Sequence, residues 1–125
     1  MSDQTTTVRE LRDLLAAFVA EREWQPFHDP KNLAASIAIE TAELMEHFQW
    51  LDVEASRQIP RDEAKLAEVG EELADVFCYT LAMANELQID LSEVMRAKMV
   101  KNIAKYPVDE YRGRFEPDGP LRDGR

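Results

Sequence analysis

Two pairs of acidic side chains have the spacing of residues that share one face of a helix. Glu40 and Glu43 are three residues apart in one apolar stretch, and Glu72 and Asp75 are three residues apart in another. Residues three or four apart lie on the same side of a helix, so each stretch presents two carboxylates together. Carboxylate oxygens are the ligands that hard divalent cations such as Mg²⁺ prefer, and Mn²⁺ is a possible substitute. The spacing therefore indicates a divalent metal between two helices.

The apolar neighbours of the first pair distinguish it from acids on a solvated face. A single Glu-x-x-Glu pair usually marks such a face, because Glu favours helices. At 100° per residue, however, Glu40 and Glu43 lie among Leu33, Ile37 and Leu44 rather than opposite them. Ionised carboxylates that converge near a core repel each other unless a cation or protons intervene. A metal is the simplest explanation for this pattern.

Other catalytic and metal-binding patterns are absent or incomplete. A di-iron bundle needs Glu-x-x-His motifs, whereas His28 lies in a predicted loop and His47 stands four residues after Glu43. The sequence has no zinc-ligand spacing, no phosphate-binding glycine loop and no Gly-x-Ser-x-Gly elbow. The single cysteine, Cys78, lies in an apolar helical pattern, which favours a buried structural role over catalysis.

Four helices are predicted to position these residues. Apolar side chains recur at intervals of three and four, and Asp29, Asp62 and Asp90 have the positions of helix N-caps. The expected helices span residues 5–23, 31–50, 61–87 and 90–106. No alternating strand pattern occurs, so we expect an all-α fold, an antiparallel four-helix bundle. Residues 1–108 are expected to form the single domain, and residues 109–125, rich in Pro, Gly and charge, an irregular tail.

Composition limits the class of protein and of partner. The chain has 125 residues, 45% of them hydrophobic, and a net charge of -10. An acidic surface disfavours binding to a nucleic acid polymer, so phosphates must be met by a local basic group or a metal. No apolar run approaches the ~20 residues of a membrane span, so we expect a cytoplasmic protein without a membrane partner. Four short helices with broad apolar faces also predict a homo-oligomer.

Basic residues on the fourth predicted helix form a local stripe in this acidic chain. Lys98, Lys101 and Lys105 lie close on its helical wheel, with Asn102 beside them and Tyr106 following. Solvated lysines near a helix C-terminus are one interpretation, because the helix dipole favours cations there. Binding of a ligand that carries several phosphates is the other. The pattern alone leaves both open.

A short loop between the first two predicted helices carries two aromatic residues and a histidine. Trp24, Phe27 and His28 stand beside Pro26 and Pro30, which indicates an ordered loop rather than a flexible linker. These side chains either line a pocket or fill the core between helices.

Taken together, four motifs resemble those of the MazG-like all-α nucleoside triphosphate pyrophosphohydrolases, in the order of that family. They are FHDPKNL at 27–33, ETAEL and FQW at 40–44 and 48–50, EELADV at 71–76, and KMVKN and YP at 98–102 and 106–107. The dCTP pyrophosphatase branch is the most similar. The resemblance implies Mg²⁺-dependent hydrolysis of a nucleoside triphosphate, dCTP or a modified dCTP, to the monophosphate and pyrophosphate, as sanitation of the nucleotide pool. It also implies a homodimer or homotetramer.

The resemblance covers roughly residues 11–108 and assigns roles to residues by their position in the sequence. The family's catalytic metal ligands match Glu40, Glu43, Glu72 and Asp75. The groups that hold phosphates match Lys98 and Asn102, with Tyr79 and Tyr106 as helpers. Positions near the nucleoside match Trp24, His28, Asn32 and Trp50.

One position departs from the dCTP-preferring members of the family. They carry a histidine in the first helix that faces the base, whereas this chain has Leu15. Leucine neither donates nor accepts a hydrogen bond, which weakens the expectation of a cytosine preference. Two alternatives therefore stay open: a pyrophosphohydrolase for another nucleotide, such as dUTP or a phosphoribosyl-ATP, and a non-enzymatic helical interaction module.

Overall fold

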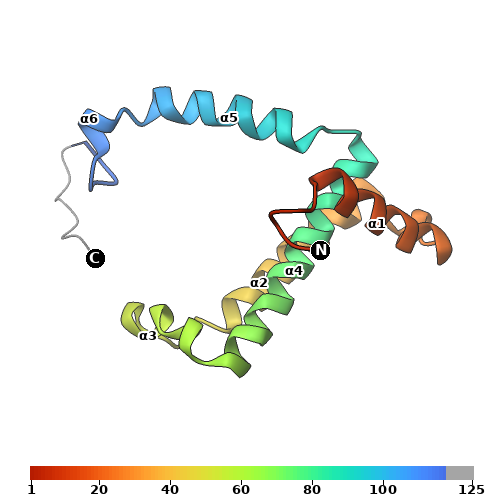
Figure 1. Cartoon of the computed structure of the whole chain (residues 1–125), viewed down its shortest axis with the longest axis horizontal. Coiled ribbons are helices and arrows are strands. Elements are labelled where there is room, and N and C mark those ends of the chain that lie inside the picture. Colours follow the sequence, from red (N-terminus) through yellow and green to blue (C-terminus); the bar gives the residue numbers. More distant parts are fainter. Residues whose placement is uncertain (118–125) are drawn as a thin grey trace. The chain divides into compact units, whose positions relative to one another are not determined.

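The computed structural model describes residues 1–117, which form helices and no β-strand (Figure 1). The prediction of an all-α chain is confirmed. The chain divides into two units, Met1–Ile89 and Asp90–Arg125, which are described in turn. The single domain expected over residues 1–108 stays a prediction.

Two helices of the first unit, α2 (Pro30–Glu46) and α4 (Glu63–Leu87), lie antiparallel and side by side (Figure 1). The predicted N-cap residues, Asp29 and Asp62, precede these two helices. The Asp29 carboxylate accepts a hydrogen bond from the Asn32 backbone N–H at 2.9 Å, and the Asp62 carboxylate accepts one from Lys65 N–H at 3.1 Å. Such bonds satisfy backbone donors that a helix start leaves free.

The connection between α2 and α4 contains two short helices that the sequence analysis did not predict. These are α3 (Val53–Arg57) and a 3₁₀ turn, η2 (Ile59–Arg61). The Asp52 carboxylate caps α3 by accepting from Ala55 N–H at 2.7 Å. The predicted second helix, to residue 50, is four residues too long because α2 ends at Glu46.

Helix α1 (Val8–Glu21) is shorter than the predicted span of residues 5–23 because Thr7 is its N-cap. The Thr7 hydroxyl accepts a hydrogen bond from Glu10 N–H at 3.1 Å, and Thr7 N–H donates to the Glu10 carboxylate at 2.6 Å. This reciprocal pair is a capping box. A 3₁₀ turn, η1 (Gln25–Phe27), then leads into α2.

Arg12 joins α1 to the C-terminal end of α4. Its side chain is buried, and its Nε donates to Asn85 Oδ1 at 2.9 Å while Nη1 donates to the Ile89 carbonyl at 2.6 Å. Asn85 Nδ2 returns a bond to the Arg12 carbonyl at 3.2 Å. The buried apolar residues of the described chain gather around this end of α4 and the start of α2. They are Leu33, Leu81, Ala82 and Ala84.

In the second unit, α5 (Leu91–Lys105) is followed by one turn of helix, α6 (Val108–Tyr111). Asp90 caps α5 by accepting from Glu93 N–H at 2.9 Å. Because α6 begins at Val108, the segment expected to be irregular starts with a helical turn. Residues 118–125 of that predicted tail lie outside the described residues. The antiparallel packing of all four long helices stays a prediction.

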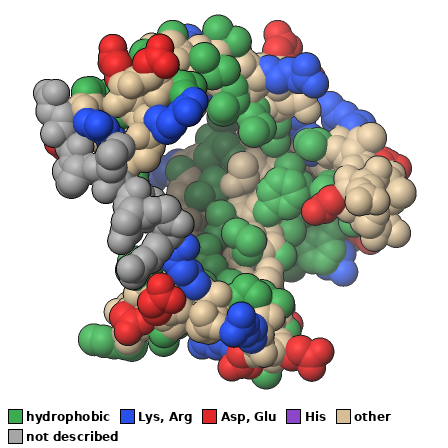
Figure 2. All heavy atoms as spheres, turned by 60° about the vertical axis from the view of Figure 1, so that its left-hand side comes forward, with side chains coloured by type: hydrophobic (Ala, Val, Ile, Leu, Met, Phe, Trp, Pro, Cys, Tyr) green, Lys and Arg blue, Asp and Glu red, His purple; other side chains and the backbone are tan. Residues whose placement is uncertain are grey.

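Large apolar side chains are exposed on both units, and many of them are visible on the face shown in Figure 2. On α4, Leu73 and Phe77 are 56% and 45% exposed; on α5, Val100 and Ile103 are 69% and 67% exposed. This exposure accords with the expected homo-oligomer, which itself stays a prediction. Within residues 1–117 no helix is long and apolar enough to cross a membrane.

Candidate metal centre and adjoining cavity

The antiparallel pairing of α2 and α4 brings one face of each helix together. On α2 this face carries Glu40 and Glu43, three residues apart, and His47, the C-cap residue, follows four residues after Glu43. The facing side of α4 includes Glu72 and Asp75, which are also three residues apart. Because the helices run in opposite directions, a residue late in α2 meets a residue early in α4. The predicted acidic pairs therefore face each other across one interface.

Three of the four predicted ligands form a compact group. Glu40, Glu43 and Glu72 each offer a carboxylate oxygen, and these three atoms lie within 4.8 Å of one another. Two carboxylate oxygens, Glu40 Oε2 and Glu72 Oε2, are buried and have no hydrogen-bond partner. Buried anionic oxygens without partners are costly, so the group has the character of an incomplete coordination site.

The pKa values of two carboxyls in this group are raised. For Glu40 the main cause is loss of hydration, followed by the hydrogen bond and charge of Glu43 and the charges of Asp75 and Glu72. For Glu72 desolvation again comes first, then the charge and hydrogen bond of Glu43 and the charge of Asp75, while His47 lowers the pKa. Desolvation and mutual repulsion thus make the ionised group unfavourable, and a bound cation would offset both.

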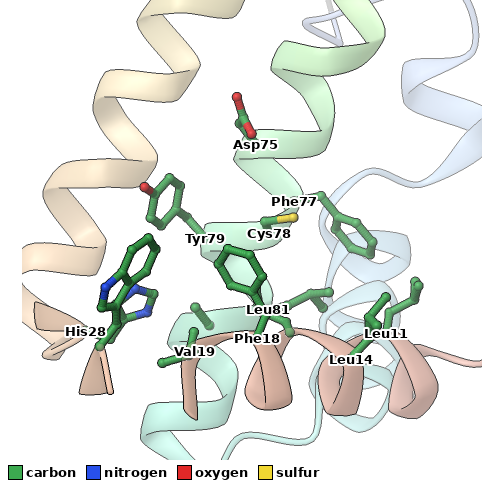
Figure 3. Close-up of a pocket in the computed structure, with 13 residues that line it drawn as sticks. Leu11, Leu14, Phe18, Val19, His28, Asp75, Phe77, Cys78, Tyr79 and Leu81 are labelled. Atoms are coloured by element: carbon green, nitrogen blue, oxygen red, sulfur yellow. The ribbon is translucent and has the colours of Figure 1, made fainter. Parts of the chain in front are cut away.

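Asp75, the fourth predicted ligand, lies next to this compact group rather than within it. Its charge raises the pKa of both Glu40 and Glu72, so it is close enough to interact with them. Asp75 also lines the cavity that adjoins the acids (Figure 3). A site made only of carboxylate oxygens fits a hard divalent cation better than zinc or copper, which bind nitrogen and sulfur ligands.

A cavity of about 600 Å³ is lined by α1, α4 and the loop that precedes α2 (Figure 3). Its wall contains three residues that the family resemblance placed near the substrate, Trp24, His28 and Tyr79, together with Leu15. Figure 3 shows His28 beside Tyr79, and their ring centroids are 6.5 Å apart. The remaining lining residues are Leu11, Leu14, Phe18, Val19, Phe77, Cys78, Leu81 and Ala82.

The loop between α1 and α2 therefore lines a pocket, which was one of its two interpretations. The Trp24 ring packs edge-on against Phe18 with centroids 5.7 Å apart, which fixes its position at the cavity. Phe27, by contrast, is 68% exposed and is not part of the lining. The polar side chains in this mostly apolar wall are His28, Tyr79, Asp75 and the thiol of Cys78.

The burial expected for Cys78 is wrong, because this residue is exposed at the cavity wall. Partial desolvation, and next the charge of Asp75, raise the pKa of its thiol. A raised pKa keeps the thiol protonated, and a protonated thiol is a poor nucleophile. The expectation that Cys78 has no catalytic role accords with this environment.

Two predicted nucleoside contacts of the first unit lie outside the cavity wall. Asn32 is held at the start of α2, where its Nδ2 donates to Asp29 Oδ2 at 2.6 Å. Trp50 follows α2 and is 88% exposed. Neither residue is among those that line the cavity, and their contact with a nucleoside stays a prediction.

Three further predicted residues lie on or directly after α5, in the second unit. Lys98 is exposed, and Asn102 is half-buried with its Nδ2 3.9 Å from Met99 Sδ. The ring of Tyr106 packs edge-on against Tyr111 with centroids 5.2 Å apart. The role of these three residues in holding phosphates also stays a prediction.

Sequence reasoning missed one residue beside the acidic group, His47. Its ring lies between Lys65 and Glu72 on α4, with Nε2 3.9 Å from Glu72 Oε1. The available signal was its spacing, four residues after Glu43, which places both side chains on one helix face.

Comparison with known proteins gives consistent matches. The MazG-like family model matches residues 35–116. The chain is 41% identical over 110 residues to dCTP pyrophosphatase 1 of Bos taurus, covering 86% of this chain and 63% of that protein. It is 41% identical over 104 residues to the Homo sapiens protein of that name, covering 81% and 59%. The chain thus spans less than two thirds of the length of these relatives.

A solved structure is also similar. It is the crystal structure of a pyrophosphatase from Archaeoglobus fulgidus, with a TM-score of 0.73 and 40% sequence identity. The match covers 86% of this chain and 98% of that chain.

Proposed function

The chain belongs to the MazG-like family, and on that premise we propose that it is a metal-dependent nucleoside triphosphate pyrophosphohydrolase. The resemblance drawn from its four motifs is confirmed by the family match and by the similarity to named pyrophosphatases. In the proposed reaction, water cleaves the anhydride between the α- and β-phosphorus atoms. The products are the nucleoside monophosphate and pyrophosphate.

The observation that carries this proposal is the pair of buried, unpartnered oxygens of Glu40 and Glu72. An interaction module would pair or solvate such oxygens, because leaving them buried and bare costs stability. A divalent cation, Mg²⁺ or Mn²⁺, would be held by Glu40, Glu43 and Glu72 with Asp75. When bound, it would neutralise phosphate charge and polarise the scissile anhydride.

The chain's own residues supply the remaining chemistry in this proposal. Glu43 or Glu40 accepts the proton of the attacking water, as a general base positioned by α2. Lys98 and Asn102 bind the oxygens of the departing pyrophosphate, with the hydroxyls of Tyr79 and Tyr106 as further donors.

The adjoining cavity is the proposed nucleoside site. Its volume of about 600 Å³ is within the usual range for small-molecule pockets. Trp24 and His28 provide aromatic surfaces on which a base could stack. The names of the relatives favour dCTP as substrate, and the motif resemblance adds a modified dCTP. Leu15 in the cavity wall offers no hydrogen bond to cytosine, which is the specific observation that keeps dUTP as the second candidate.

A panel of canonical and 5-modified nucleoside triphosphates tests the proposal, with pyrophosphate release measured in the presence of Mg²⁺. We expect release from at least one deoxynucleotide and none after addition of a chelator. Glu43→Gln is the matched inactive control, because it keeps the size of the side chain and removes the charge. If the wild-type protein releases no pyrophosphate from any member of the panel, the proposed activity is wrong.

We further propose that the protein works as a homodimer or homotetramer in the cytoplasm. Each unit exposes large apolar residues, such as Phe77 on α4 and Val100 on α5, and these support association because burying apolar surface between chains is favourable. Light scattering on the purified protein tests this, and a monomeric mass at micromolar concentration would contradict it.

A further inference from the structure

His47 lies at the C-terminal end of α2, where it is in contact with several charged groups of α4. Its side chain is 18% exposed. The Lys65 ammonium nitrogen lies 3.0 Å from Nδ1 of the imidazole, and Glu72 Oε1 lies 3.9 Å from Nε2 on the opposite side of the ring. Glu68 Oε2 lies 4.0 Å from Nδ1 and 3.7 Å from Lys65 Nζ. The ring thus bridges a lysine and a member of the metal centre.

The lysine determines which nitrogen of the ring carries the proton. An ammonium group only donates hydrogen bonds, so Nδ1 of His47 must accept the bond at 3.0 Å. A neutral imidazole that accepts at Nδ1 carries its hydrogen on Nε2. The Nε2–H therefore faces Glu72 Oε1.

The two oxygens of Glu72 consequently differ in their environment. Oε1 faces the imidazole, whereas Oε2 is buried without a partner. A donor on one oxygen restricts rotation of the carboxylate and keeps the other oxygen directed toward the interface. The separation of 3.9 Å exceeds a hydrogen bond, and a side-chain adjustment of about 1 Å would close it.

We propose that His47 is a positioning residue for Glu72, and that Lys65 sets its tautomer. The proposal rests on the metal-dependent function proposed above, because Glu72 acts there as a metal ligand. Groups around metal ligands that orient them typically change metal affinity by about 10- to 100-fold when removed. His47 is not itself a ligand, since its Nε2 hydrogen occupies the nitrogen that faces the centre.

The test is the affinity of the purified full-length protein for Mn²⁺ alone, measured by electron paramagnetic resonance of the free ion. His47→Leu fills the space without a donor, and His47→Asn places its amide near the Nδ1 position. Both should weaken Mn²⁺ binding by about 10-fold or more. His47→Gln places an amide donor near the Nε2 position, and binding should stay within about 3-fold of wild type, since the donor is kept.

A second readout is the tautomer itself. Long-range ¹⁵N–¹H correlation of the metal-free protein should show the His47 proton on Nε2. A ring protonated on Nδ1 only, or on both nitrogens, would overturn the proposal. Lys65→Met removes the donor to Nδ1 and should increase the share of the Nδ1–H tautomer, whereas an unchanged tautomer population would count against the assigned role of Lys65.

Three controls separate the possible failures. Glu68→Gln removes a nearby exposed charge and should change Mn²⁺ affinity by less than about 2-fold; a loss as large as that of His47→Leu would assign the effect to general electrostatics. If Glu72→Gln abolishes Mn²⁺ binding but His47→Leu does not weaken it, only the role of His47 is refuted. If the wild-type protein does not bind Mn²⁺, both the proposed metal centre and the positioning role of His47 are refuted.

Discussion

Replacing Arg12 by methionine should destabilise the protein much more than replacing an exposed arginine of the same helix. Arg12→Met keeps an unbranched apolar side chain in the buried position but removes two charged donors. Asn85 Oδ1 and the Ile89 carbonyl then lose partners at 2.9 and 2.6 Å. Each buried acceptor left without a partner costs about 1 to 3 kcal/mol. Both acceptors lie near a helix end where water can enter in part, so we expect a total loss of about 2 to 4 kcal/mol.

Arg9→Met is the matched control because Arg9 lies on the same helix and forms an exposed pair. Its guanidinium is 3.6 Å from Asp13, and the two side chains are 63% and 67% exposed. Such pairs are worth about 0.5 kcal/mol. Urea denaturation, followed by circular dichroism without metal and at one fixed protein concentration, gives both free energies of unfolding. If the two variants differ by less than about 1 kcal/mol, Arg12 does not hold α1 against α4 as argued.

The Arg12→Met variant also tests whether α1 supports the cavity independently of the metal centre. Helix α1 carries Leu15 and Phe18 of the cavity wall, whereas the acids belong to α2 and α4. Loosening α1 should therefore raise KM for the nucleotide and leave Mn²⁺ affinity unchanged. If the affinity for Mn²⁺ fell as much as the affinity for the nucleotide, α1 would also support the acidic group.

Four further predictions concern the metal centre and one strained residue. Glu43→Gln or Asp75→Asn should lower kcat by about 100-fold or more with an unchanged far-ultraviolet spectrum; retained activity would contradict the assignment. Desolvation and neighbouring acids raise the pKa of Glu40, so the folded state binds this proton more tightly than the unfolded chain does. Metal-free wild type should accordingly lose stability relative to Glu40→Gln as pH rises above 4.5 toward neutrality, in parallel urea titrations. Mg²⁺ at 100 times its Kd should stabilise wild type by about 2.7 kcal/mol but not Glu72→Gln, as measured by thermal melting. Gln88 ends α4 with a φ of 54°, so Gln88→Gly should raise stability by up to about 1 kcal/mol, and a decrease would refute this reasoning.

The long helices were predictable because their caps and apolar period are local properties of the sequence. Asp29, Asp62 and Asp90 all cap the helices that they were expected to begin. The short helices α3 and η2 were missed because three to five residues contain too little of a helical period to detect. The early start predicted for α1 has a similar cause, since Thr5 and Thr6 resemble the true cap, Thr7, in sequence.

Predicting the acidic group required less knowledge of how the helices pack than predicting the cavity. Two acids three residues apart on each helix must share a face, and only the pairing of α2 with α4 was then needed. The contact of His47 with Lys65 depends on the register between these helices, which no local pattern specifies. The cavity wall likewise depends on how α1 crosses α4. The family resemblance nevertheless named Trp24, His28 and Tyr79, and all three lie in that wall.

The distribution of burial along α4 explains how the chain tolerates a repulsive acidic group. The buried core residues Leu81 and Ala84, and the bonds from Arg12, all lie near the C-terminal end of the helix. Glu72 lies about two and a half turns before Leu81, next to Leu73, which is 56% exposed. Packing and hydrogen bonds at the C-terminal end of α4 can therefore offset the repulsion among the acids around Glu72. Metal-free protein should accordingly exchange amide hydrogens faster around Glu72 than around Leu81, and Mg²⁺ should slow exchange mainly around Glu72. Uniform protection along α4 without metal would show that the acids do not weaken the helix locally.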